Sequence, residues 1–334
     1  MSKLILTADD FGLNEGVNEA TIQSVKNKTI TSVQVMINMA SEQQIRSLAA
    51  AVHEAGNLCG IGLHFCTTYG PSLMQKPTSF TIKDADGVFN FIDIKDWDYH
   101  SDSNDDMKEE LTAQFKLLKS IIGSERIDSL SSHQNIHLFN PDYMKMVGQL
   151  AEDNYVPVRS PLRWNQDLGN KSYPDGLVMQ PIEDDAIKTV VNCKSINTRK
   201  MLYDGISPNK MMSCAAIIND NKKTGGTPNT MCGHWYRQPK KRALNWIVQQ
   251  LDEIHPNKPF YATEILMHLS NSVIGDDPKQ NYKMVDRLKE FEVLNSIDVK
   301  DFIHSLYSKA NFELGSYRKV LMGETVSYDL PTVV

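Results

Sequence analysis

The sequence has few cysteines, and they are not arranged in short motifs. The five residues are Cys59, Cys66, Cys193, Cys214 and Cys232, scattered along 334 residues without a CxxC pair. Disulfide-stabilised domains and cysteine-rich zinc sites rely on closely spaced, even sets of cysteines. Neither class of protein is therefore expected.

Long hydrophobic runs and an excess of positive charge are absent as well. No apolar segment approaches the roughly 20 residues of a membrane-spanning helix. The formal net charge is -6, with no basic cluster to offset it, which argues against binding to nucleic acids or membrane surfaces. The first residues lack the apolar core and cleavage site of a signal peptide, so we expect a cytoplasmic protein.

Several common catalytic motifs are also missing. The sequence has no GxSxG nucleophile elbow, no P-loop and no GxGxxG after a strand. Cys66 follows His64 by two residues, but this spacing along a strand does not establish contact, so a thiol nucleophile is not supported. The length would allow one large α/β barrel or two medium domains. Because no linker or internal repeat divides the chain, we expect a single domain over residues 1–334.

The sequence does contain a repeated alternation of apolar strands and amphipathic helices. Strands are expected at residues 3–7, 32–37, 58–63, 127–132, 156–159, 213–218 and 259–267. Helices are expected at residues 15–26, 41–53, 107–122, 184–202, 240–254, 280–294 and 297–310, with another beginning near Pro141. This alternation is typical of parallel α/β proteins. We predict a distorted, TIM-like (β/α) barrel with long loops at the carboxyl-end mouth, one of them at residues 67–106.

Residues able to bind metals or transfer protons gather where these strands end. They are Asp9, Asp10, His64, His133, His137, Arg159 and His268. In parallel α/β folds, the carboxyl edge of the sheet carries the functional site. We therefore expect these side chains to share one site.

Each of these residues alone has a simpler explanation. Two adjacent carboxylates repel each other, and a bound divalent cation would remove that cost. An acidic turn that caps the next helix would explain Asp9 and Asp10 equally well. A single histidine after an apolar strand, such as His64 or His268, is often only a structural residue at the strand edge, with its ring nitrogens hydrogen-bonded and no metal bound. His133 and His137 have HxxxH spacing, which can bind a metal, but the glutamate of HExxH is missing.

Taken together, these segments resemble the YdjC-like family, which includes the chito-oligosaccharide deacetylases. The matching segments are TADDFG at residues 7–12 followed by Asn14 and Gly16, GLHF at 62–65, SH to HLF at 132–139, RSP at 159–161 and EILMH at 264–268. They follow the family's order and span most of the chain.

The resemblance implies a (β/α)-barrel hydrolase with a metal ion held by Asp10, His64 and His133. It also implies that Asp9 is the general base and that His268 is a catalytic acid or transition-state stabiliser. The expected substrate is a small N-acetylated sugar, a chito-oligosaccharide or its 6-phosphate. One carboxylate and two imidazoles leave coordination positions open for water and substrate, and this set suits one zinc or magnesium ion.

Three further residues are candidates for substrate contacts. His137 is one, and Arg159 could bind a sugar hydroxyl or phosphate, or form a salt bridge at the sheet edge. His234 could lie in a substrate-binding loop or in an aromatic-packed turn. The sequence departs from the family at Ser131 and Asn135, where an aspartate and a histidine are usual.

Other functions remain compatible with the same residues. One alternative is a metal hydrolase of another amide or of a phosphoester. A second is a catalytically degenerate family member that binds sugar in a regulatory role. No nucleic-acid or membrane partner is expected. The sequence leaves the oligomeric state open, with a homodimer as the commonest default among oligomers.

Overall fold

A parallel sheet forms the centre of the protein. The computed structural model describes residues 2–74, 88–89, 104–122, 127–133, 141–159, 229–232, 262–273, 281–308, 310 and 312–328. The strands are β1 (Ser2–Phe11), β2 (Ser32–Val35), β3 (Gly60–Phe65), β6 (Leu130–Ser132), β7 (Asn229–Cys232), β8 (Ala262–Met267) and β9 (Phe312–Leu314). Their order is β6-β3-β2-β1-β8-β7, and β9 pairs with β1. A separate antiparallel pair joins β4 (Gly70–Pro71) to β5 (Val88–Phe89).

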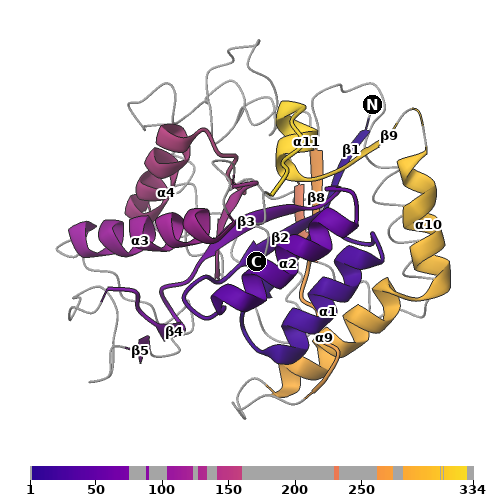
Figure 1. The fold of residues 1–334 in the computed structure, drawn as a ribbon, viewed down its shortest axis with the longest axis horizontal. Helices are drawn as coiled ribbons and strands as arrows, with labels where there is room; N and C mark the ends of the chain where they lie inside the picture. The colour runs from indigo at the N-terminus through magenta and orange to yellow at the C-terminus, as the bar shows by residue number, and fades with distance from the viewer. Residues whose placement is uncertain are drawn as a thin grey trace, which may run out of the picture.

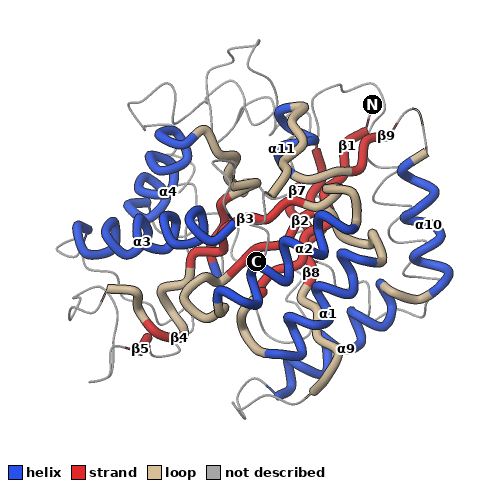
Figure 2. The backbone as a smooth tube through the Cα atoms, viewed as in Figure 1, coloured by secondary structure: helices blue, strands red, loops and turns tan. Residues whose placement is uncertain are grey.

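The helices surround this sheet. They are α1 (Glu15–Lys26), α2 (Glu42–Glu54), α3 (Asn104–Ile122), α4 (Pro141–Asn154), α9 (Asn281–Leu294), α10 (Ile297–Tyr307) and α11 (Tyr317–Met322). Contacts join them in the order α4-α3-α2-α1-α9-α10, which follows the order of the strands they accompany (Figure 1). Figure 2 shows the strands curled at the centre with the helices outside them. The predicted α/β class with a barrel-like parallel sheet is therefore confirmed.

Strand β1 occupies the middle of the sheet. Residues 7–11 pair with β2, residues 3–8 with β8, and residues 2–4 with β9, all in parallel. The strand is longer than the five residues expected from the apolar run, because its pairing continues through the acidic segment to Phe11.

Local capping explains where the first helices begin. The Asn14 side chain accepts a hydrogen bond from the backbone of Val17 and caps α1. Ser41 and Gln44 form a capping box at the start of α2, as a serine at this position predicts. Because Asn14 caps α1, helix capping does not account for the two aspartates before it.

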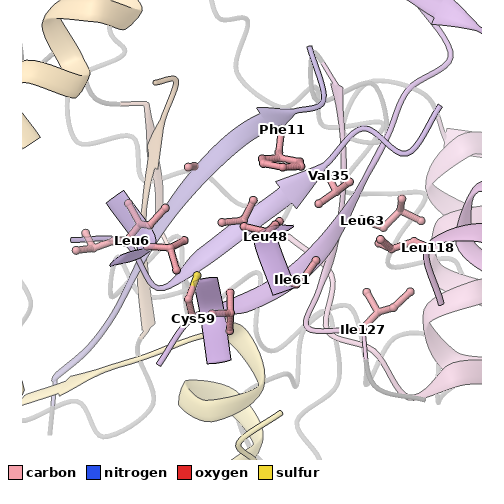
Figure 3. Close-up of a cluster of buried hydrophobic side chains, with 14 of the residues drawn as sticks. Leu6, Phe11, Val35, Leu48, Cys59, Ile61, Leu63, Leu118 and Ile127 are labelled. Carbon is pink, nitrogen blue, oxygen red and sulfur yellow. The ribbon is translucent and has the colours of Figure 1, made fainter. Parts of the chain in front are cut away.

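The two faces of the sheet differ in chemistry. One face is apolar and packs against the helices through Leu4, Leu6, Ala8, Val33, Val35, Ile61, Leu63 and Leu130. Figure 3 shows Val35, Ile61 and Leu63 near Leu48 of α2 and Leu118 of α3. Apart from Ile5 near the start of β1, the alternate residues are polar or small and equally buried: Thr7, Asp9, Ser32, Gln34, Gly62, His64, Ser129 and Ser131. Strand alternation thus separates an outer hydrophobic core from a polar inner face.

Most expected elements that fall on described residues are found. The predictions at residues 15–26, 107–122 and 280–294 correspond to α1, α3 and α9, whereas α10 is shorter than predicted. In place of the strand predicted at 156–159, the structure has a single parallel β-bridge between Val158 and Leu130. Strands β7 and β9 and helix α11 are present although the sequence did not predict them. The predictions at 184–202, 213–218 and 240–254 lie outside the described residues. Among the described helices, none combines the length and apolarity that crossing a bilayer requires.

Candidate functional site

Asp9 and Asp10 lie in an irregular stretch at the end of β1. The register with β2 shifts between Ala8 and Phe11, and Asp10 has a φ of 67°. Aspartate is among the few residues that tolerate this left-handed conformation. In a regular strand, adjacent side chains would point to opposite faces. Here both carboxylates approach His64, whose Nε2 lies 3.8 Å from Asp9 Oδ2 and 3.2 Å from Asp10 Oδ1.

Two imidazoles converge on one oxygen of Asp10. His64 Nε2 lies 3.2 Å and His133 Nδ1 lies 3.0 Å from Asp10 Oδ1. One ligand atom from each residue can be chosen so that all three lie within 4.8 Å of one another. Asp10 and His64 are buried, whereas His133, in a short turn after β6, is partly exposed. A carboxylate and two imidazoles gathered in this way fit a divalent cation.

The charge state of Asp10 suits a metal ligand. Burial alone would raise the pKa of this carboxyl group, but the positive charge of Arg287 and the contact with His133 outweigh burial. The pKa of Asp10 is consequently held well below its usual range. The group is therefore ionised at neutral pH, as a metal ligand must be.

Arg287 is a site residue that the sequence reasoning missed. It lies on α9, and its Nη2 donates at 2.5 Å to Asp10 Oδ2, the oxygen that His64 and His133 do not contact. Its Nη1 is buried and has no hydrogen-bond partner within the described part of the chain. The same helix holds the end of β8, because Glu290 accepts a hydrogen bond from the backbone of His268. Helix α9 therefore contributes to the site although no strand ends there.

Arg159 links Asp9 to a third buried carboxylate. Its Nη1 and Nη2 donate to the two oxygens of Asp9 at 2.9 and 2.7 Å, while Nε and Nη2 contact Glu264 at 3.2 and 2.9 Å. The guanidinium is fully buried. Of the two roles expected for Arg159, the structure shows the salt bridge. Burial opposes ionisation of Asp9, but the Arg159 charge prevails and lowers the pKa of that carboxyl group.

His268 lies near the second oxygen of Asp10, the one bound by Arg287. Its Nε2 is 3.9 Å from Asp10 Oδ2, and 32% of its side chain is exposed. The partial removal of the ring from water and the nearby charge of Arg287 lower the pKa of His268 to about 4, against the opposing effect of the two aspartates. The imidazole is therefore neutral at pH 7. Burial raises the pKa of Cys66 to about 12, which leaves no thiolate to act as a nucleophile.

Helix α3 fixes the loop that follows β3 beside the site. Gln114 exchanges two hydrogen bonds with the backbone of Cys66. Glu110, fully buried, accepts hydrogen bonds from the backbone of Leu73 and Met74 and from the hydroxyl of Ser72. The loop therefore has a defined position two residues beyond His64.

Six of the predicted site residues come together in this way: Asp9, Asp10, His64, His133, Arg159 and His268. The other two, His137 and His234, lie outside the described residues. The chemical roles of all eight residues stay predictions.

The fold and the site define a barrel-like α/β protein with a carboxylate and imidazole cluster at its strand ends. The chain belongs to the YdjC-like protein family, whose model matches residues 3–305. A carbohydrate deacetylase of Brevibacillus brevis is 31% identical over 160 residues, covering 48% of this chain and 59% of the relative. A chitooligosaccharide deacetylase of Proteus mirabilis is 27% identical over 165 residues, covering 47% and 58%.

These matches span less than two thirds of the length of the curated relatives. A solved structure from Enterococcus faecalis V583, provisionally described as a cellobiose-phosphate cleavage protein, is similar over 95% of this chain and 98% of its own. The TM-score is 0.59 at 17% sequence identity, so this likeness concerns the fold alone.

Proposed function

We propose that the protein is a metal-dependent hydrolase that removes the acetyl group from an N-acetylated sugar. The observation that carries this proposal is the convergence of His64 and His133 on Asp10, with the ionised Asp9 beside them. Family membership supports it, because the matched curated relatives are named carbohydrate and chitooligosaccharide deacetylases. A small chito-oligosaccharide or its 6-phosphate is the substrate class we favour.

The proposed ligands of the metal ion are Asp10, His64 and His133, and the ion would be zinc or magnesium. When bound, such an ion polarises a carbonyl group and lowers the pKa of a coordinated water. Three protein ligands leave coordination positions for water and substrate. Arg287 would orient Asp10 by holding its other oxygen, so that Oδ1 stays turned toward the two imidazoles.

Asp9 is the proposed general base. Arg159 binds both of its oxygens, which keeps the group ionised and fixes its orientation. The same pairing makes Asp9 a weak base, so a proton taken from water would have to pass to a second group. His268 is the proposed acceptor of that proton. Because its imidazole is neutral at pH 7, it can gain the proton and then donate it to the amine nitrogen as the C–N bond breaks.

Acetate release tests this proposal directly. Diacetylchitobiose, with and without a 6-phosphate, would be incubated with protein that has been stripped by a chelator and reloaded with zinc or magnesium. We expect release only after reloading, and we expect His133→Gln to abolish it. His53→Gln, which changes an exposed histidine on α2, is the matched control and should retain full activity.

Two results would count against the proposal. Equal acetate release after exhaustive chelation would exclude the metal. Metal binding at the three residues without release from either sugar would favour hydrolysis of another amide or of a phosphoester, or a regulatory role in sugar binding.

A further inference from the structure

A chain of buried hydrogen bonds leads from Gln34 on β2 to the ring of His64. His64 Nδ1 lies 2.7 Å from Ser131 Oγ, and that hydroxyl donates to Gln34 Oε1 at 2.7 Å. Gln34 Nε2 in turn donates to Ser129 Oγ at 2.7 Å and to Ser32 Oγ at 3.2 Å. All five side chains are at most 2% exposed, so bulk water does not compete for these bonds.

The hydrogen bonds have one consistent direction when His64 serves as a ligand. Its Nε2 faces Asp10, and a neutral imidazole that binds a cation through Nε2 carries its proton on Nδ1. Nδ1 must then donate to the Ser131 hydroxyl, whose own proton goes to the carbonyl oxygen of Gln34. The two serine hydroxyls that accept from Gln34 Nε2 keep this carbonyl turned toward Ser131.

Gly62 leaves the space that this arrangement needs. A Cβ atom at Gly62 would lie 2.5 Å from both Gln34 Nε2 and Ser129 Oγ, far inside van der Waals contact. The side-chain amide of Gln34 occupies the space that the missing side chain of Gly62 leaves beside β3.

We propose that Ser131 and Gln34 are positioning residues of the metal site. They hold His64 with its proton on Nδ1 and so present Nε2 toward Asp10. The inference rests on the proposed function for its metal ion but not for its substrate. Groups that hydrogen-bond a ligating histidine set its tautomer, and their removal typically weakens metal binding by about 10–100-fold.

Zinc affinity, measured by competition with a chromophoric chelator, provides the first test. We expect Ser131→Ala to weaken binding by about 10–100-fold. The matched control is Ser24→Ala, which removes an equally buried serine hydroxyl on α1 that donates to the backbone of Ala20 and has no part in the chain of bonds to His64; its affinity should stay near wild type. In the Ser131→Ala background, Gln34→Met should cause little further loss, because the connection to His64 is already broken.

A spectroscopic test addresses the tautomer itself, independently of catalysis. The zinc-loaded protein would be labelled with ¹⁵N-histidine, and the His64 signals would be assigned with His64→Gln. We expect wild-type Nδ1 to carry a proton that exchanges slowly with solvent. Ser131→Ala should accelerate that exchange or move the proton from Nδ1 to Nε2. Ser131→Thr, which keeps the hydroxyl, should give the wild-type spectrum.

The outcomes separate this inference from the proposed function. An unprotonated Nδ1 in the wild-type protein would overturn the inference without any variant having to fold. Wild-type affinity in Ser131→Ala, together with loss of binding in His64→Gln, would overturn the positioning role and leave the metal site intact. Unchanged affinity in His64→Gln would refute both proposals.

Discussion

Replacing Arg159 with methionine should destabilise the protein severely. The guanidinium is fully buried and lies between Asp9 and Glu264, each only 2% exposed. Methionine keeps much of the side-chain volume but leaves two buried carboxylates without their shared cation. Breaking a buried ion pair by removing one partner costs about 3–5 kcal/mol. Because whole domains are stable by only about 5–15 kcal/mol, this loss is a large share of the total.

The effect should depend on pH in a defined direction. In the wild-type protein the pKa of Asp9 is lowered, so its stabilising contribution is present above the unfolded-state pKa and is lost as pH falls through the folded-state value. In Arg159→Met, burial is no longer opposed by the guanidinium charge, so the pKa of Asp9 rises relative to the wild-type protein. Acid then neutralises Asp9 in the variant. The difference in stability between the two proteins should therefore shrink as pH falls from 7 toward about 4.

Urea unfolding at several pH values would measure both effects. Arg46→Met is the matched control: Arg46 pairs with Glu42 at 2.7 Å on the surface of α2, and such an exposed pair contributes about 0.3–0.5 kcal/mol. Adding Glu264→Gln to Arg159→Met should recover stability, because one uncompensated charge is removed. The reasoning fails if Arg159→Met costs no more than the control, or if Glu264→Gln gives no recovery.

Three further substitutions test other parts of the site. Asp10→Asn should fold, because asparagine tolerates the φ of 67°, but it should weaken zinc binding by more than about 100-fold in a chelator competition; retained affinity would exclude Asp10 as a ligand. Gly62→Ala should cost about 1–3 kcal/mol in urea unfolding, because its Cβ would collide with Gln34, and wild-type stability would contradict the crowding described above. Glu110→Gln should accelerate amide exchange at Leu73 and Met74 and cost about 1–3 kcal/mol, since an amide nitrogen cannot accept the hydrogen bonds of a carboxylate oxygen; unchanged exchange would refute this role.

The position of the site could be predicted because strand ends can be recognised in the sequence. Apolar runs mark β1, β3 and β8, and the polar residue after each run lies at the same edge of a parallel sheet. The structure brings Asp10, His64 and His268 together, as this reasoning predicts without any knowledge of distances. It depends only on hydrophobic pattern and on the shared direction of the strands.

The partners of these residues could not be predicted in the same way. Arg287 reaches Asp10 from the middle of helix α9. From the sequence alone, an arginine at such a position is predicted to be an ordinary surface residue. The φ of Asp10 depends on how β1 pairs with β2, which the sequence of either strand alone does not specify. Glu264 did offer a signal: a glutamate within the apolar run of β8 must be paired if it is buried, and the structure shows Arg159 as that partner.

The central place of β1 has a consequence for the order in which the protein can fold. Its first residues pair with Ala262 in β8 and with Phe312 in β9, which the ribosome makes long after β1 itself. Contacts between residues so distant in sequence form slowly, because a long loop must close before they stabilise the chain. A nascent chain that has reached Arg159 already contains Asp10, His64 and His133, yet one edge of β1 is still unpaired. The strand that carries both aspartates is thus among the last to be completed, and an exposed edge of this kind is a target for chaperones and for aggregation.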